Sequence, residues 1–64
     1  MSIAEQLKQT RLQLGLSQSQ AAKLLNRSIS TISQMERGRW ACERAITEAI
    51  ELLQLRYTKS QSNP

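Results

Sequence analysis

The stretch from residue 17 to residue 38 constrains the fold most, because several helix-boundary signals lie close together in it. Ser17 begins an S-x-x-Q pattern, which satisfies free backbone amides at the start of a helix. Asn26 tolerates the left-handed conformation that commonly ends a helix, and Ser28 is a favoured residue just before a helix begins. Gly38 supplies a further stop signal. The stretch therefore predicts two short helices, 18–26 and 29–37, joined by a tight turn.

The chain on either side of this stretch predicts two longer helices. Ser2 and Glu5 form an S-x-x-E capping box, and a helical apolar pattern follows until Gly15, which predicts a helix over 3–14. A last helix begins near Glu43, whose charge suits a helix N-terminus. The apolar stripe of this last helix consists of Ile46, Ala49, Ile50, Leu53 and Tyr57.

The expected architecture is an all-α domain of four helices over residues 1–57, in which the C-terminal helix is extended. The segment 58–64 is polar and has no apolar side chain that could dock it, so we expect a disordered tail there. A chain of 64 residues buries only about 60% of its unfolded surface, so its stability needs a supplement. One cysteine excludes an internal disulfide, and the absence of histidine argues against zinc. Oligomerisation is the supplement that remains.

Catalysis has almost no support in this sequence. Cys42 lacks a histidine base that could activate it, so we expect a small buried or half-buried residue there, and neither an enzyme nor a cofactor. No apolar run approaches the roughly 20 residues of a membrane span, and no signal-peptide core is present. Together with the lone thiol, this favours a cytoplasmic protein without a membrane partner.

The positive charge is concentrated in one part of the chain. Residues 1–42 carry six Lys or Arg and two Glu, whereas residues 43–64 carry three basic and three acidic residues. The whole net charge of +4 therefore belongs to the part that holds the two short helices. This favours a polyanionic partner, nucleic acid before membrane, although ordinary solvated surface is the alternative.

The helix predicted over 29–37 has an unusual outward face. Ile32, Met35 and Glu36 can point inward, which leaves a surface of small polar residues that is poor in helix propensity. Such a helix has little reason to exist for packing alone and is suited to recognise a ligand. In the first helix, Arg11 interrupts an apolar stripe and needs a partner if it is buried.

The segment Leu14–Gly38 resembles the helix-turn-helix of the phage repressor and Cro family, the Xre-like group of bacterial regulators. The residues that match are Leu14, Gly15, Leu16, Ser17, Gln18, Ala22, Ile32, Glu36 and Gly38. The resemblance covers about residues 3–53 and implies a compact lambda-repressor-like DNA-binding domain. It also implies that Arg11 pairs with Glu36 as a structural ion pair. Asn26 replaces the usual glycine, Ala21 a larger apolar residue, and a longer last helix the usual fifth helix.

The resemblance implies that the second helix of the motif enters the major groove of DNA. The residues that it assigns to base readout are Ile29, Ser30, Ser33 and Gln34. Gln34 suits adenine and Ile29 the methyl group of thymine. Candidate contacts to the DNA backbone are Gln18, Arg27, Ser28, Thr31, Arg37, Arg39 and Trp40.

These residues also have plain structural alternatives. Ser33 and Gln34 can be solvated surface, and Ile29 can fold back under the preceding helix. Trp40 is balanced between closing the end of the core and lying on a phosphate. Leu52, Leu55 and Tyr57 widen the apolar arc of the last helix, so we expect a dimer interface there, although packing on the first helix is the alternative.

The sequence thus favours a homodimeric repressor or autoregulator of phage, plasmid or mobile-element type that binds a short palindromic operator in double-stranded DNA. The alternative is a protein-interaction module, such as an antitoxin or a small phage inhibitor, that uses the same fold against a protein. The chemistry of the helix predicted over 29–37 suits structured RNA less well than the major groove of B-form DNA. No ligand pocket and no small-molecule effector is evident in the sequence.

Overall fold

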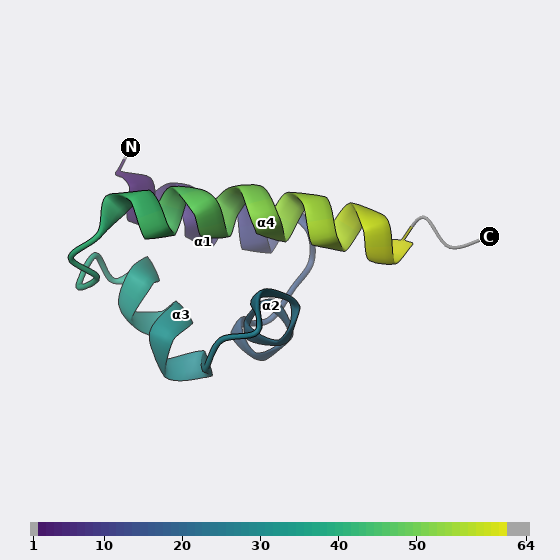
Figure 1. The fold of residues 1–64 in the computed structure, drawn as a ribbon, viewed down its shortest axis with the longest axis horizontal. Coiled ribbons are helices and arrows are strands. Elements are labelled where there is room, and N and C mark those ends of the chain that lie inside the picture. The colour runs from purple at the N-terminus through teal and green to yellow at the C-terminus, as the bar shows by residue number, and fades with distance from the viewer. Residues whose placement is uncertain (1, 62–64) are drawn as a thin grey trace.

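The structure is a computed structural model that describes residues 2–61, with side chains described as far as Tyr57. The predicted all-α fold with four helices is confirmed: α1 (Ile3–Gln13), α2 (Gln18–Leu25), α3 (Ile29–Glu36) and α4 (Glu43–Gln61) (Figure 1). The predicted starts of all four helices are confirmed. The first three helices end one residue earlier than predicted, and α4 ends later.

Serine side chains fix the starts of the first three helices. Ser2 and Ser17 complete both halves of a capping box, with Glu5 and Gln20 respectively. Ser28 accepts a hydrogen bond at its Oγ from the backbone N–H of Thr31, at 3.1 Å. Each serine thereby satisfies an amide that has no partner within its own helix.

The ends of these three helices share one backbone geometry. Gly15, Asn26 and Gly38 have positive φ angles of 73°, 57° and 76°. The amide that follows each of them donates to a carbonyl five positions back: Leu16 to Arg11, Arg27 to Ala22 and Arg39 to Gln34. These bonds satisfy carbonyls that the helix leaves free, as in the Schellman motif. The left-handed turn allows α3 to leave α2 at a sharp angle.

Helix α4 runs along the long axis of the molecule, with α1 behind it and with α2 and α3 on one side of this pair (Figure 1). Contacts of α4 with α1 and α2, and of α3 with α1 and α2, close the core. The buried core cluster consists of Leu7, Ala21, Ala22, Leu25, Ile32, Met35, Ile46, Ala49 and Leu53. The two alanines of α2 let neighbouring helices approach it closely. The core therefore holds α3 by two residues, Ile32 and Met35, on its inner face.

Two sequence-based expectations, for Cys42 and for the end of α4, differ from the structure. Cys42 is exposed rather than buried, because it precedes the first turn of α4 and lies outside the core. Of the two alternatives for Trp40, the structure agrees with the one in which it closes the end of the core, since Trp40 is half-buried and packs against the core cluster. The α4 backbone remains helical to Gln61, past the predicted boundary at Tyr57, since an established helix extends by one hydrogen bond per added residue. The predicted disorder of residues 62–64 lies outside the described residues.

Candidate nucleic-acid interface

The outer face of α3 gathers the residues that the sequence assigned to base readout. Ile29 is 50% exposed, Ser30 and Gln34 are exposed, and Ser33 is half-buried. The side-chain amide of Gln34 donates to the Oγ of Ser30 at 3.4 Å, a long and exposed contact. Ile32 and Met35 pack α3 against the core. Ile29 and the exposed polar side chains of α3 are therefore not needed for this packing. The alternative in which Ile29 folds under α2 does not describe this exposed side chain.

The turn before α3 is held by its own hydroxyl groups. Ser28 Oγ caps the helix and lies 2.9 Å from the Oγ1 of Thr31. The first turn of α3 is thereby fixed before any ligand arrives. The N-terminal end of α3, where a groove-binding helix makes its base contacts, is thus held by hydrogen bonds within its own first turn.

An ion pair connects α1 to the C-terminal end of α3. Arg11 Nε lies 2.7 Å from Glu36 Oε2, and Arg11 Nη2 donates to Glu36 Oε1 at 3.1 Å, which makes the pair bidentate. The third contact of the guanidinium is from Nη1 to the carbonyl oxygen of Leu16, at 2.8 Å. The Arg11 and Glu36 side chains are only 9% and 5% exposed. This is the partner that a buried arginine on α1 required.

Gln18 joins this pair from the start of α2. Its side-chain Nε2 donates to Glu36 Oε1 at 3.2 Å, so one carboxylate receives bonds from both α1 and α2. The sequence assigned Gln18 to a DNA phosphate and did not reveal this contact, which spans 18 positions along the chain. Only one of the two hydrogens of the amide is needed for Glu36, because a primary amide is a double donor.

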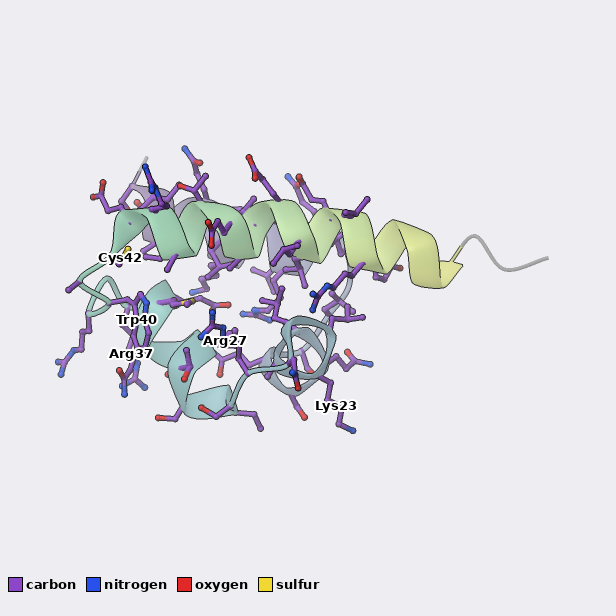
Figure 2. All side chains as sticks on the ribbon, in the orientation of Figure 1. Lys23, Arg27, Arg37, Trp40 and Cys42 are labelled. Carbon is purple, nitrogen blue, oxygen red and sulfur yellow. The ribbon has the colours of Figure 1, made fainter. Side chains whose placement is uncertain are left out.

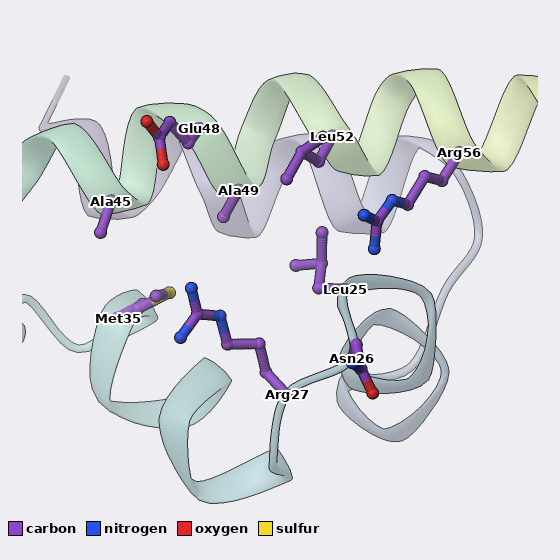
Figure 3. A pocket seen from close by; sticks show the side chains of 9 residues that line it. All are labelled: Leu25, Asn26, Arg27, Met35, Ala45, Glu48, Ala49, Leu52 and Arg56. Atoms are coloured by element: carbon purple, nitrogen blue, oxygen red, sulfur yellow. The ribbon is translucent and has the colours of Figure 1, made fainter.

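Basic side chains surround α3, although they do not all point the same way (Figure 2). Arg37 and Arg39 are exposed and follow α3 directly, with Trp40 packed beside them on the core. Arg27 follows α2, but its guanidinium turns into a groove between the α2–α3 turn and α4 (Figure 3). Arg27 therefore does not lie beside the exposed face of α3 in this conformation.

That groove has a volume of about 310 Å³ and was not evident from the sequence. The residues that line it are Leu25, Asn26, Arg27, Met35, Ala45, Glu48, Ala49, Leu52 and Arg56. Arg56 reaches across it, with Nη1 donating to the carbonyl oxygen of Leu24 at 2.8 Å. This bond links α4 to the end of α2. The sequence offered no signal for it beyond a basic residue near the end of the last helix.

The residues predicted to form a subunit interface lie along α4. Leu52 is 37% exposed, Leu55 is 63% exposed and Tyr57 is half-buried. Leu52 and Leu55 belong neither to the buried core cluster nor to the partly buried residues that pack against it. Leu12 on α1 is a further exposed apolar residue, at 50%, that the sequence pattern did not single out.

Two further features bear on the kind of site this is. Within residues 2–61, the side chains that the structure describes contain no group of three or more His, Cys, Asp or Glu residues placed to hold a metal ion. Over the same part of the chain, none of the helices combines the length and the hydropathy of a membrane span.

A sequence model of a protein family, described as a helix-turn-helix domain, matches residues 2–56. The match extends from the capping box of α1 into the last third of α4. No curated protein and no solved structure gives a match to this chain.

Proposed function

Because the chain belongs to the helix-turn-helix domain family, we propose that it is a sequence-specific regulator of transcription that binds an operator in double-stranded DNA. In this proposal it acts as a homodimer on a short palindrome and represses a promoter, its own among the candidates. The resemblance of residues 14–38 to phage repressors and Cro proteins favours a phage, plasmid or mobile-element origin for this role.

The observation that carries the proposal is the exposed outer face of α3. Ile32 and Met35 hold the helix on the core, whereas Ile29, Ser30 and Gln34 project from it. A helix that is fixed on one side and chemically varied on the other suits insertion into the major groove. The neighbouring arginines supply positive charge around it.

Gln34 is the residue best suited to direct base readout. Its amide can make a bidentate contact with N6 and N7 of adenine, worth about 1–3 kcal/mol of discrimination against another base. The bond to Ser30 that it must release is 3.4 Å long and exposed to water, so the release costs little. Ile29 lies five residues earlier, at the start of α3, and offers an apolar contact to a thymine methyl group.

In this proposal, contacts to DNA phosphates lie on both sides of the base contacts. The second hydrogen of the Gln18 amide and the free amides at the start of α2 favour a phosphate oxygen there. Arg37, Arg39 and the half-buried Trp40 offer contacts on the other side of α3. Arg27 must leave the groove before it can join them. Such contacts set the affinity and its salt dependence rather than the sequence preference.

A single chain reads few base pairs, so two copies are needed for a specific operator. The twofold symmetry of a dimer implies a palindrome whose half-sites lie about one helical turn apart, roughly 34 Å from centre to centre. The exposed Leu52 and Leu55 on α4 support a contact between copies.

Selection from a pool of random duplexes, followed by sequencing, tests the proposal. We expect an enriched palindrome, with an affinity that falls steeply as salt rises. Absence of duplex binding at low salt, together with tight binding to a protein target, would replace the proposal with a protein-interaction module. Preference for structured RNA over duplex DNA would contradict it as well.

A further inference from the structure

The face of α4 that borders the groove carries a row of charges with an apolar centre. Glu48, Leu52 and Arg56 are spaced four residues apart, so they lie along one ridge of the helix. All three line the groove, which contains no residue of α1 (Figure 3). Leu52 is 37% exposed, with an acidic side chain one turn before it and a basic side chain one turn after it.

Neither charge of this row forms an ion pair among the side chains that the structure describes. Among the side chains that the structure describes, Glu48 has no hydrogen bond and no ion pair. Arg56 donates from Nη1 to the carbonyl oxygen of Leu24, and the other donors of its guanidinium have no partner among the residues that the structure describes. An apolar centre flanked by opposite unpaired charges is complementary to a reversed copy of itself.

We propose that this row is the contact between two copies of the chain, with the two α4 helices antiparallel and Leu52 near the twofold axis. The proposal rests on the homodimer of the proposed function and assigns its register. A twofold rotation about Leu52 exchanges the positions four residues before and after it. Each Glu48 then meets Arg56 of the other copy, and the two Leu52 side chains meet each other. A parallel pairing would instead place like charges together.

This register keeps the α3 helices of both copies on the same side of the dimer. In Figure 1, α1 lies behind α4, and α2 and α3 lie below it, which leaves the side of α4 toward the viewer free of the other helices. The twofold axis of two antiparallel helices is perpendicular to the plane that contains them. A second copy that packs on the free face of α4 therefore has its own α3 below that plane too. Both copies can then face one duplex.

A charge-swap experiment tests the register. Four variants of the full chain are prepared: Glu48→Arg, Arg56→Glu, the double variant with both changes, and Glu51→Arg. Glu51 is an exposed acidic residue on the same helix that lies off the row, so its replacement is the matched control. Sedimentation at low salt gives the mass of each variant and of the equimolar mixture of the first two.

We expect the wild type, the double variant and Glu51→Arg to be dimers. Each single variant on the row loses two attractive pairs and gains two repulsive ones, so its dimer dissociation constant rises about tenfold or more. Mixing the two single variants should produce a heterodimer, since the two basic positions of the first variant then face the two acidic positions of the second. The lost bond to Leu24 cannot imitate this pattern, because the double variant lacks it as well.

Several results would overturn the proposal. These are a monomeric wild type, dimeric single variants, a mixture that remains monomeric, or a dimer lost in Glu51→Arg but kept in Glu48→Arg. Binding of each variant to a half-site duplex is measured in parallel and should not change, because α3 is untouched. If the charge-swap pattern holds but no duplex is bound, the DNA-binding function fails while the contact between copies stands.

Discussion

Arg11 makes three hydrogen bonds, two to the distant Glu36 and one to Leu16 just past the end of α1, and each of its three guanidinium nitrogens takes part. Glu36 is paired with it and also accepts a bond from Gln18. Removing one member of such a pair leaves a buried charge without compensation, whereas removing both leaves an apolar gap. The pair is therefore better understood as fixing the position of α3 than as adding to net stability.

Arg11→Met should lower the free energy of unfolding by about 3–5 kcal/mol, because the Glu36 carboxylate stays buried without its partner. This is as large as the whole stability expected of a domain of this size, roughly 3–5 kcal/mol, so the variant should be mostly unfolded. Urea denaturation followed by circular dichroism measures the change.

Adding Glu36→Leu to Arg11→Met should recover a large part of the loss. The matched control is Arg44→Met, an exposed arginine on α4, which should change stability by no more than about 0.5 kcal/mol. An Arg11→Met variant as stable as this control would show that the pair has no such structural role.

Gln34→Ala should flatten the sequence preference at one position of each half-site, while binding to random duplex stays nearly unchanged. The physical reason is that a bidentate base contact is lost but no phosphate contact is. Competition between operator and random duplex measures the ratio. Gln13→Ala, at an exposed glutamine at the end of α1, is the control. If Gln34→Ala weakened binding to every duplex equally, the residue would not be a base reader.

Helix boundaries were the part of the fold most accessible from the sequence. Ser2, Ser17 and Ser28 act within one turn of their own position, and so do the left-handed residues Gly15 and Asn26. Local chemistry of this kind does not depend on how the helices pack, which is why the starts of all four helices were predicted.

Contacts across the chain were accessible only where a resemblance supplied them. The pairing of Arg11 with Glu36 came from the family pattern, but the bond from Gln18 to Glu36 and that from Arg56 to Leu24 did not. Each depends on the angle at which two helices meet, and single residue types do not specify that angle. The exposure of Cys42 was missed for a different reason, because a small apolar residue fits both a core and a surface.

The turn between α2 and α3 depends on one left-handed residue, Asn26, with φ of 57°. Asn26→Val should lower the free energy of unfolding by about 1–2 kcal/mol, because a β-branched side chain is strained in this conformation. Asn26→Gly should leave it within about 0.5 kcal/mol of the wild type, since glycine adopts positive φ freely. Thermal unfolding of the two variants measures the difference, and equal melting temperatures would contradict this role of Asn26.

At the scale of the whole molecule, α4 takes part both in the proposed contact between copies and in the packing against α2. The same Arg56 that is proposed to meet a second copy also binds the carbonyl of Leu24 at the end of α2. Helix α2 in turn contacts α3. Arg56 thus takes part both in the proposed dimer contact and in the packing of α4 on α2. A change there is expected to weaken binding to a full operator, which needs the dimer, while binding to a single half-site stays the same.

The exposed thiol of Cys42 allows the orientation of the two α4 helices in the proposed dimer to be measured as a distance. It is the single cysteine of the chain and lies ten positions before Leu52, so a spin label attached there marks the start of α4 without further mutation. At 1.5 Å per residue, antiparallel helices that cross at Leu52 separate the two labels by about 30 Å. Helices that ran parallel would bring them within about 10 Å of each other, the distance between packed helix axes. One distance distribution between the two spin labels, measured by pulsed electron paramagnetic resonance, therefore distinguishes antiparallel from parallel α4 helices.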